Sequence, residues 1–138
     1  MKNKKFLALL DVSLIEIISQ KSQYELIQYQ LNKKNLLLVN YINEDPNDIA
    51  SCKEILRKIN EKLSIQGIVF FSLLQLCYGS KIKLNVIKEA LAKKYEIFFN
   101  RENIHIKNFN EFKRIEKDLL LFKANNLSLL DKIKYIQK

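Results

Sequence analysis

The stretch "IQGIVFFSLLQLCYGS", residues 65–80, is the most apolar part of the chain and decides its fold. Its apolar run has about a dozen residues, too few for a transmembrane helix. Such a run, rich in Ile, Val and Phe, is typical of a strand that is covered on both faces inside a parallel sheet. We therefore expect "GIVFFSLL" to form an interior strand, with Val69 and Phe71 facing one side. Ile68 and Phe70 should face the other side.

Strands and helices alternate on both sides of this segment. Further strands are predicted for "KKFLALLDV" (residues 4–12), "NLLLVNYI" (35–42) and "YEIFF" (95–99), with a short terminal strand through Ile104 and Ile106. The segments between them carry apolar residues at steps of three and four, which predicts amphipathic helices. Strands that alternate with such helices pair in parallel through right-handed crossovers. The sequence thus predicts a three-layer, flavodoxin-like α/β domain: a mainly parallel sheet of four to five strands with helices on both faces.

Capping residues predict where the helices begin. Ser13 is expected to cap the first helix, which should run to Lys34. In "NEDPND" (43–48), Asp45 is the expected N-cap of the second helix, with Pro46 at the first helical position. The remaining predicted N-caps are Ser80, Asn110 and Ser128.

The composition is that of one ordinary globular domain. With 138 residues, 48% hydrophobic and 28% charged, the chain can bury a core of its own. We expect a single α/β domain over residues 1–138, with about 125–138 forming a C-terminal helical appendage. The net charge of +9 comes from scattered Lys, in a sequence also rich in Asn and Ile, as an AT-rich genome encodes. A solvated basic surface is therefore expected, rather than nucleic acid as the principal ligand.

The cysteines and the N-terminus both indicate a cytoplasmic protein. Cys52 and Cys77 form no CxxC motif, and the single histidine, His105, has no partner at metal-ligand spacing. We expect reduced, partly buried thiols and no metal site. The N-terminal apolar run resembles a secretion signal, but Asp11 and Glu16 interrupt it and no small-residue cleavage site follows. No membrane span is expected.

Polar residues that follow the predicted strands are the candidates for a site, because ligands of open parallel sheets bind beyond the carboxyl ends of the strands. Four groups are expected there. They are Asp11 and Ser13; Asn40 and Tyr41; Ser72, Gln75, Cys77 and Tyr78; and Asn100, Arg101, Glu102 and His105. No glycine-rich loop follows the first strand, so neither a dinucleotide site nor a P-loop is expected, and we predict no cofactor.

These candidates also have structural interpretations. Ser13 fits a helix N-cap better than a nucleophile, because no second His or other obvious base is available to activate it. Ser72 and Gln75 can satisfy backbone groups of the loop after the third strand. His105, between two isoleucines, can be a half-buried strand residue.

The succession of strands and helices, with "GIVFFSLLQL" as third strand and "KKYEIFFNRENI" around the fourth, resembles the catalytic domain of serine recombinases (resolvases). "LLDVS" stands where that family begins its nucleophile loop, with Ser13 at the serine, and "LLQLCYGS" stands where it has an arginine-bearing motif. Gln75 and Tyr78 occupy the positions of those arginines. Because attack on a phosphodiester needs cations at the developing charge, the resemblance implies the resolvase fold and not the reaction.

A second resemblance covers most of the chain. Its segments are "QYELIQYQLNKKNLLL" (23–38), "GIVFFSLLQL" (67–76), "KKYEIFFNRENIHI" (93–106) and "FNEFKRIEKDLLL" (109–121). They are similar to the sporadic carbohydrate cluster proteins, short proteins encoded among bacterial surface-polysaccharide biosynthesis genes. That family has tyrosine–serine and then leucine–glutamine–leucine in its third strand, where this chain has "FS" at 71–72 and "LQL" at 74–76. Its glutamate after the fourth strand corresponds to Glu102.

The second resemblance implies an accessory protein or small enzyme of bacterial surface-polysaccharide biosynthesis, which binds a sugar or nucleotide sugar at the carboxyl edge of the sheet. The expected ligand-binding residues are Ser72, Gln75, Asn100, Arg101 and Glu102, followed by Ser13, Tyr78 and His105. The alternative is a non-catalytic, recombinase-like module that acts through protein or nucleic-acid binding. Whether the chain is an enzyme stays open. The apolar "DLLLF" (118–122) and "LSLLDKIKYI" (127–136) predict a homodimer that uses one of the last two helices.

Overall fold

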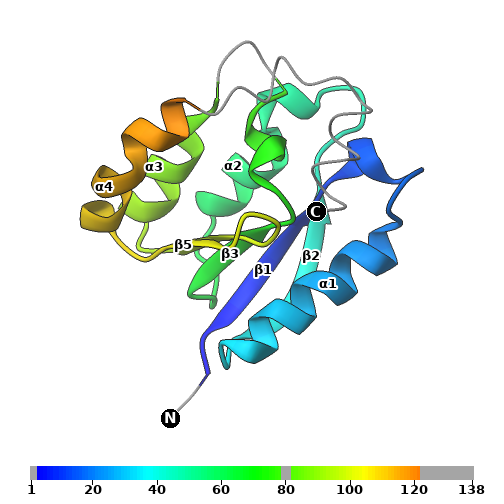
Figure 1. The fold of residues 1–138 in the computed structure, drawn as a ribbon, viewed down its shortest axis with the longest axis horizontal. Coiled ribbons are helices and arrows are strands. Elements are labelled where there is room, and N and C mark those ends of the chain that lie inside the picture. Colours follow the sequence, from blue (N-terminus) through cyan, green and yellow to red (C-terminus); the bar gives the residue numbers. More distant parts are fainter. Residues whose placement is uncertain (1–2, 79–81, 122–138) are drawn as a thin grey trace.

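One five-stranded sheet forms the centre of the molecule (Figure 1). The computed structural model describes residues 3–78 and 82–121. The strands are β1 (Lys5–Leu10), β2 (Leu37–Asn43), β3 (Gly67–Phe70), β4 (Glu96–Phe99) and β5 (Ile104–Ile106). Their order is β2-β1-β3-β4-β5; the first four are parallel, and β5 runs antiparallel to β4. The predicted, mainly parallel sheet is confirmed, in the strand order of flavodoxin-like folds but with the last strand reversed.

Helices cover both faces of the sheet. They are α1 (Gln20–Lys33), α2 (Lys53–Ile59), α3 (Leu84–Ala92) and α4 (Phe109–Leu120), with short 3-10 turns η1 (Val12–Leu14), η2 (Ile49–Ser51) and η3 (Leu73–Leu76). α1 lies against one face, while α2, α3 and α4 lie against the other (Figure 1). This is the predicted three-layer α/β arrangement. Within the described residues, no helix combines the length and the apolar character that crossing a membrane requires.

β3 is buried at every position. Ile68, Val69 and Phe70 are fully buried, and the following Phe71 is 1% exposed. Val69 and Phe71 pack into the core beneath α1. Ile68 and Phe70 pack into the core beneath α2, α3 and α4. The predicted division of this stretch between the two faces of the sheet is therefore confirmed.

β2 is an outer strand and is largely exposed. Its exposed apolar side chains are Leu37, Val39 and Tyr41. Phe6 of β1 pairs with Leu38 of β2, and the next residue, Leu7, pairs with Asn40. Val39 is thus an extra residue on β2, which forms a β-bulge.

The first helix begins later than predicted. Ser13 is not its N-cap: the Asp11 carboxylate accepts a hydrogen bond from the Ser13 backbone N–H at 3.0 Å and starts the turn η1. α1 begins only at Gln20, with Ser19 as its N-cap. The side chain of Gln23 holds the loop between them, because its Oε1 accepts from Asp11 N at 2.7 Å and its Nε2 donates to Asp11 O at 2.9 Å. These side-chain bonds connect the first turn of α1 to the backbone at the end of β1.

The second helix is shorter than predicted. Asp45 accepts a backbone N–H within a turn and caps no helix. α2 begins at Lys53, after Cys52, whose φ of 54° is left-handed and separates η2 from α2. The Glu44 carboxylate caps α2 from outside, accepting two backbone N–H groups of the first turn at 2.9 and 2.8 Å. A cap that reaches from the end of β2 leaves no local pattern in the sequence.

The remaining predicted caps have different outcomes. The N-cap of α4 is Asn108, whose side chain accepts a backbone N–H of the first turn, and not the predicted Asn110. Ser80, Ser128 and the predicted C-terminal appendage at 125–138 lie outside the described residues.

Candidate functional site

Polar side chains gather where β3 and β4 end, at the carboxyl edge of the sheet. Ser72 follows β3, and its Oγ donates to Oε2 of Glu102 at 2.8 Å. The other Glu102 oxygen accepts the Leu73 backbone N–H at 2.9 Å. The structure thus brings together Ser72 and Glu102, which follow adjacent strands of the sheet.

Gln75 uses both ends of its amide to bond backbone groups. Its Oε1 accepts from Ser72 N and its Nε2 donates to Leu9 O on β1, each at 3.0 Å. Gln75 is only 6% exposed and Ser72 is fully buried, so both side chains satisfy backbone groups from inside the fold. Ser72 Oγ also accepts from Leu74 N at 3.1 Å, which completes a capping box at the start of η3. We call Ser72, Gln75 and Glu102 the exit network.

Asn100 and Arg101 extend the pairing of β3 and β4 beyond the last strand residue. Their backbone N–H groups donate to Phe70 O and Phe71 O, each at 2.9 Å. Asn100 is 7% exposed, and its Oδ1 has no hydrogen-bond partner within residues 3–78 and 82–121. Buried amide oxygens are normally satisfied, so a water or a ligand group is the expected partner of this oxygen.

A second cluster, made of Asp11, Ser13 and Tyr78, lies beyond the end of β1. Tyr78 Oη donates to Asp11 Oδ2 at 2.6 Å. Ser13 Oγ lies 2.6 Å from Asp11 Oδ1 and 2.7 Å from Tyr78 Oη. Asp11 is buried, whereas Ser13 is exposed. Burial, followed by the negative charge of Asp11, raises the pKa of Tyr78, so the phenol stays a neutral donor.

This cluster offers an exposed hydroxyl supported by a buried carboxylate. The Asp11 carboxylate accepts from Ser13 at the distance that a general base requires. The same carboxylate also accepts from Tyr78 and from the Ser13 N–H, so three donors share its two oxygens. The arrangement therefore suits holding a ligand hydroxyl better than activating a nucleophile. In the described part of the chain, no group of three or more His, Cys, Asp or Glu is placed to hold a metal ion.

The two cysteines are free and buried. Burial, with the charge of Glu44 as a second cause, raises the pKa of the Cys52 thiol to about 11. Cys77 Sγ lies 3.5 Å from the carbonyl oxygen of Leu73. Buried thiols of this kind are unreactive, so neither is a candidate nucleophile.

Three predicted carboxyl-edge residues lie elsewhere. Asn40 and Tyr41 are inside β2, opposite the middle of β1. His105 points back to the amino edge of the sheet, because β5 runs antiparallel. Its Nε2 is 2.8 Å from Oε1 of Glu96, the first residue of β4. Burial lowers the pKa of His105 against the opposing effect of Glu96, so the imidazole is neutral at pH 7.

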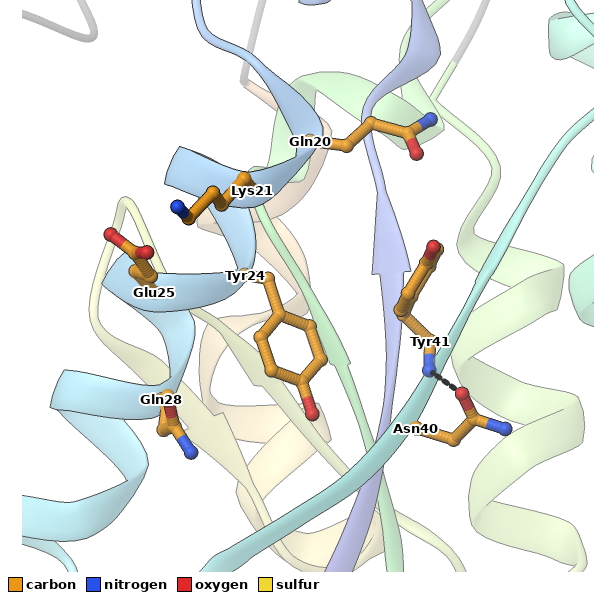
Figure 2. A pocket seen from close by; sticks show the side chains of 7 residues that line it. All are labelled: Gln20, Lys21, Tyr24, Glu25, Gln28, Asn40 and Tyr41. Atoms are coloured by element: carbon orange, nitrogen blue, oxygen red, sulfur yellow. Dashed lines mark hydrogen bonds between the residues drawn. The ribbon is translucent and has the colours of Figure 1, made fainter.

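A groove between α1 and β2 has the size and chemistry of a small-ligand site (Figure 2). Its volume is about 480 Å³. The residues that line it are Gln20, Lys21, Tyr24, Glu25, Gln28, Asn40 and Tyr41, and we call it the α1–β2 groove. Tyr24 of α1 and Tyr41 of β2 meet edge to face, with ring centroids 5.7 Å apart.

The polar groups of this groove are not committed to the protein. Asn40 accepts the Tyr41 backbone N–H through Oδ1 at 2.8 Å, which leaves its Nδ2 available (Figure 2). No hydrogen bond within the described part of the chain involves the other side-chain amides and hydroxyls, those of Gln20, Gln28, Tyr24 and Tyr41. Amides of α1 and the two phenols thus line a groove that contains two aromatic rings, and the Asn40 side chain extends from β2 away from α1 (Figure 2).

Reasoning from the sequence missed the α1–β2 groove. The available signal is the spacing of Gln20, Tyr24 and Gln28, which lie four residues apart and therefore share one face of α1. The second wall, Asn40 and Tyr41, belongs to β2 and is identified only when the helix is placed beside that strand.

Comparisons with known proteins add no family to this picture. Neither a protein-family model nor a curated protein matches the chain. Three features of the structure therefore bear on function: the exit network, the cluster of Asp11, Ser13 and Tyr78, and the α1–β2 groove.

Proposed function

We propose that this chain binds a sugar-type ligand in the α1–β2 groove, as a cytoplasmic accessory protein or small enzyme of bacterial surface-polysaccharide biosynthesis. The observation that carries the proposal is the meeting of two tyrosine rings with uncommitted amides in one groove of small-molecule size. The biosynthetic setting is supported by the resemblance to the sporadic carbohydrate cluster proteins. Its first segment, residues 23–38, includes Tyr24 and Gln28 of the groove.

The chemistry of the groove fits a sugar ring. Such a ring presents C–H groups on its faces and hydroxyls around its rim. A tyrosine offers an apolar surface with negative charge on the ring face, which attracts polarised C–H groups. The side chains of Gln20, Gln28 and Asn40 each contain donors and acceptors without charge, as hydroxyl groups require. Lys21 and Glu25 contribute one charge of each sign, so a neutral ligand is favoured over a phosphate.

The residues expected from the sequence to bind the ligand have a different part in this proposal. Ser72, Gln75 and Glu102 hold the loop after β3 through the bonds of the exit network. Asn100, with an unsatisfied buried oxygen, and Ser13, with an exposed hydroxyl, are the carboxyl-edge groups that retain atoms for a ligand. They define the competing location that the experiment has to separate from the groove.

The test is a thermal-shift screen of monosaccharides and nucleotide sugars, followed by titration calorimetry with the best compound. A ligand at a hundred times its dissociation constant stabilises the fold by about 2.7 kcal/mol. Tyr41→Ala should weaken binding by about tenfold or more, because it removes one ring of the groove. Tyr29→Ala is the matched control: Tyr29 is on α1 and is 59% exposed, against 44% for Tyr41, but it does not line the groove.

The control should bind like the wild type. Equal losses in Tyr41→Ala and Tyr29→Ala would contradict a site in the groove. Binding that survives Tyr41→Ala but disappears in Asn100→Ala or Ser13→Ala would move the ligand to the carboxyl edge.

We also propose a homodimer that uses the end of α4. Leu120 and Leu121 are 60% and 64% exposed, and neighbouring exposed leucines commonly mark an interface. Light scattering should give twice the chain mass of 16.4 kDa. Leu121→Lys should shift the protein to the monomer, and a wild-type monomer at high micromolar concentration would reject the dimer.

A further inference from the structure

A concavity at the amino edge of the sheet carries a net positive charge. Its volume is about 650 Å³, and the end of α1, the start of β4 and β5 surround it. The charged and titratable side chains that line it are Lys4, Lys34, Glu96, His105 and Lys107. The α1–β2 groove shares none of these residues.

One carboxylate faces three ammonium groups in this concavity. Glu96 bonds Lys4 through Oε2, and its Oε1 lies 2.8 Å from His105 Nε2, so both carboxylate oxygens are occupied. Lys34 and Lys107 form no ion pair with any described residue. Both side chains are exposed, and Lys34 Nζ lies 5.1 Å from the centroid of the Phe98 ring.

Two carbonyl groups at the end of α1 are satisfied within the chain. Leu31 O and Asn32 O accept backbone N–H groups from residues 34–36, so these two do not present unpaired acceptors to an anion.

The charges of Lys34 and Lys107 both affect the pKa of His105. Burial is the main cause that lowers its pKa, the hydrogen bond to Glu96 opposes it, and the charges of Lys34 and Lys107 lower the pKa further. Lys4 and the His105 ring both contact Glu96. Two phenylalanine rings, which carry no charge, meet the imidazole edge-on. An anion held between Lys34 and Lys107 would offset their repulsion of the imidazolium and raise this pKa.

We propose that this concavity binds a small phosphate-bearing ligand, with Lys34 and Lys107 as its cationic anchors. Lysine is a common phosphate partner because its compact charge sits on a flexible stem. The concavity has the dimensions of a small-molecule site. Its charge sets it apart from the near-neutral groove between α1 and β2, and the proposal does not rest on the sugar-binding function.

The single histidine of the chain provides the readout. Proton NMR of the His105 ring in the full chain is recorded over a pH series, with inorganic phosphate or pyrophosphate added at constant ionic strength. The expected result is a saturable shift of the ring signals and a higher pKa for His105 in the presence of either anion. Lys34→Gln and Lys107→Gln should each weaken binding by about tenfold.

Lys33→Gln is the matched control. Lys33 precedes Lys34 and is exposed, but its Nζ lies 4.3 Å from the centroid of the Tyr29 ring and it does not line the concavity. This variant removes the same charge and should bind pyrophosphate like the wild type. A melting curve of each variant verifies the fold.

Three results would overturn the site. Equal weakening of pyrophosphate binding by Lys33→Gln and Lys34→Gln, or a lack of saturation with either anion, would mean that binding is general attraction to a basic surface. The third result is displacement of pyrophosphate by a short DNA duplex whose binding depends on Lys33 as much as on Lys34. That result would assign these lysines to a nucleic-acid surface.

Discussion

The exit network after β3 and the α1–β2 groove contain the same kinds of side chain and use them in opposite ways. Ser72 and Gln75 of the exit network are buried, and their side chains form hydrogen bonds with backbone groups and with Glu102. Gln28 and Asn40 of the groove are exposed and keep donors and acceptors available. An amide that follows a central strand joins neighbouring strands, whereas an amide over an outer strand is available to a ligand. Because its polar side chains keep donors and acceptors available, the face of β2 beside α1 is better suited to bind a ligand than the exit network.

The largest expected contrast between these regions is in packing, measured by Phe70→Ala on β3 and Val39→Ala on β2. Phe70 is fully buried and stacks on Phe99 with ring centroids 5.2 Å apart. Removal of a buried phenylalanine ring costs about 3–5 kcal/mol of unfolding free energy. Val39 is 44% exposed, so its truncation should cost about 0.5 kcal/mol.

Urea unfolding at constant slope measures both losses. Phe70→Leu, which keeps an apolar side chain, should fall between the two and guards against a Phe70→Ala variant that does not fold. Equal costs for Val39→Ala and Phe70→Ala would abolish the contrast between the central and the outer strand.

The next contrast compares two glutamines. Gln75→Ala leaves the backbone groups of Ser72 and Leu9 without their partner, and an unsatisfied buried group costs about 1–3 kcal/mol. Gln28→Ala removes an exposed amide with no bond to another described residue, so its unfolding free energy should stay within about 0.5 kcal/mol of the wild type.

Thermal unfolding and ligand titration of the two glutamine variants sharpen the contrast. Gln28→Ala should lose sugar affinity and keep its melting temperature, and Gln75→Ala should do the reverse. A Gln75→Ala variant that melts like the wild type but fails to bind would make the exit network a ligand site.

The smallest expected effect is a pH dependence of the unfolding free energy that comes from Glu44. This residue follows the exposed strand β2, but its side chain is buried and caps α2. Burial raises the pKa of Glu44, against the lowering effect of the two backbone N–H groups. A carboxyl whose pKa is higher in the folded state stabilises fully below its unfolded value, and that contribution is lost as the pH rises through the folded value. The wild type should therefore lose stability relative to Glu44→Gln as the pH rises above 4.5. Urea unfolding of both proteins at several pH values measures the difference, and a trend of opposite sign would mean that the cap outweighs burial.

The centre of the fold could be predicted because its signal is local. A strand covered on both faces needs a continuous apolar run, and "GIVFF" supplies it. The helix starts could not be predicted in the same way. The first turn of α1 is joined to Asp11 by the side chain of Gln23, and α2 is capped by Glu44, which lies ten and eleven residues before the two N–H groups that it accepts. Contacts of this kind depend on how the elements pack, and no capping pattern in the sequence records them.

The candidate sites were less predictable than the fold. The meeting of Ser72 with Glu102 follows from their positions after adjacent strands. His105 was misplaced because an apolar triplet does not reveal the direction of its strand, and the antiparallel β5 returns it to the amino edge. The groove depends on Tyr24 and Tyr41 facing each other, which only the docking of α1 beside β2 establishes.

The bulge at Val39 affects edge-to-edge pairing between the sheets of separate molecules. An outer strand with exposed apolar side chains is a template on which another chain can add a strand and start an aggregate. The extra residue in β2 twists and offsets the backbone, so a strand that pairs in step with one half of β2 is out of step with the other half. This irregularity disfavours repeated strand addition at the edge of the sheet. The α1–β2 groove remains accessible to a small molecule.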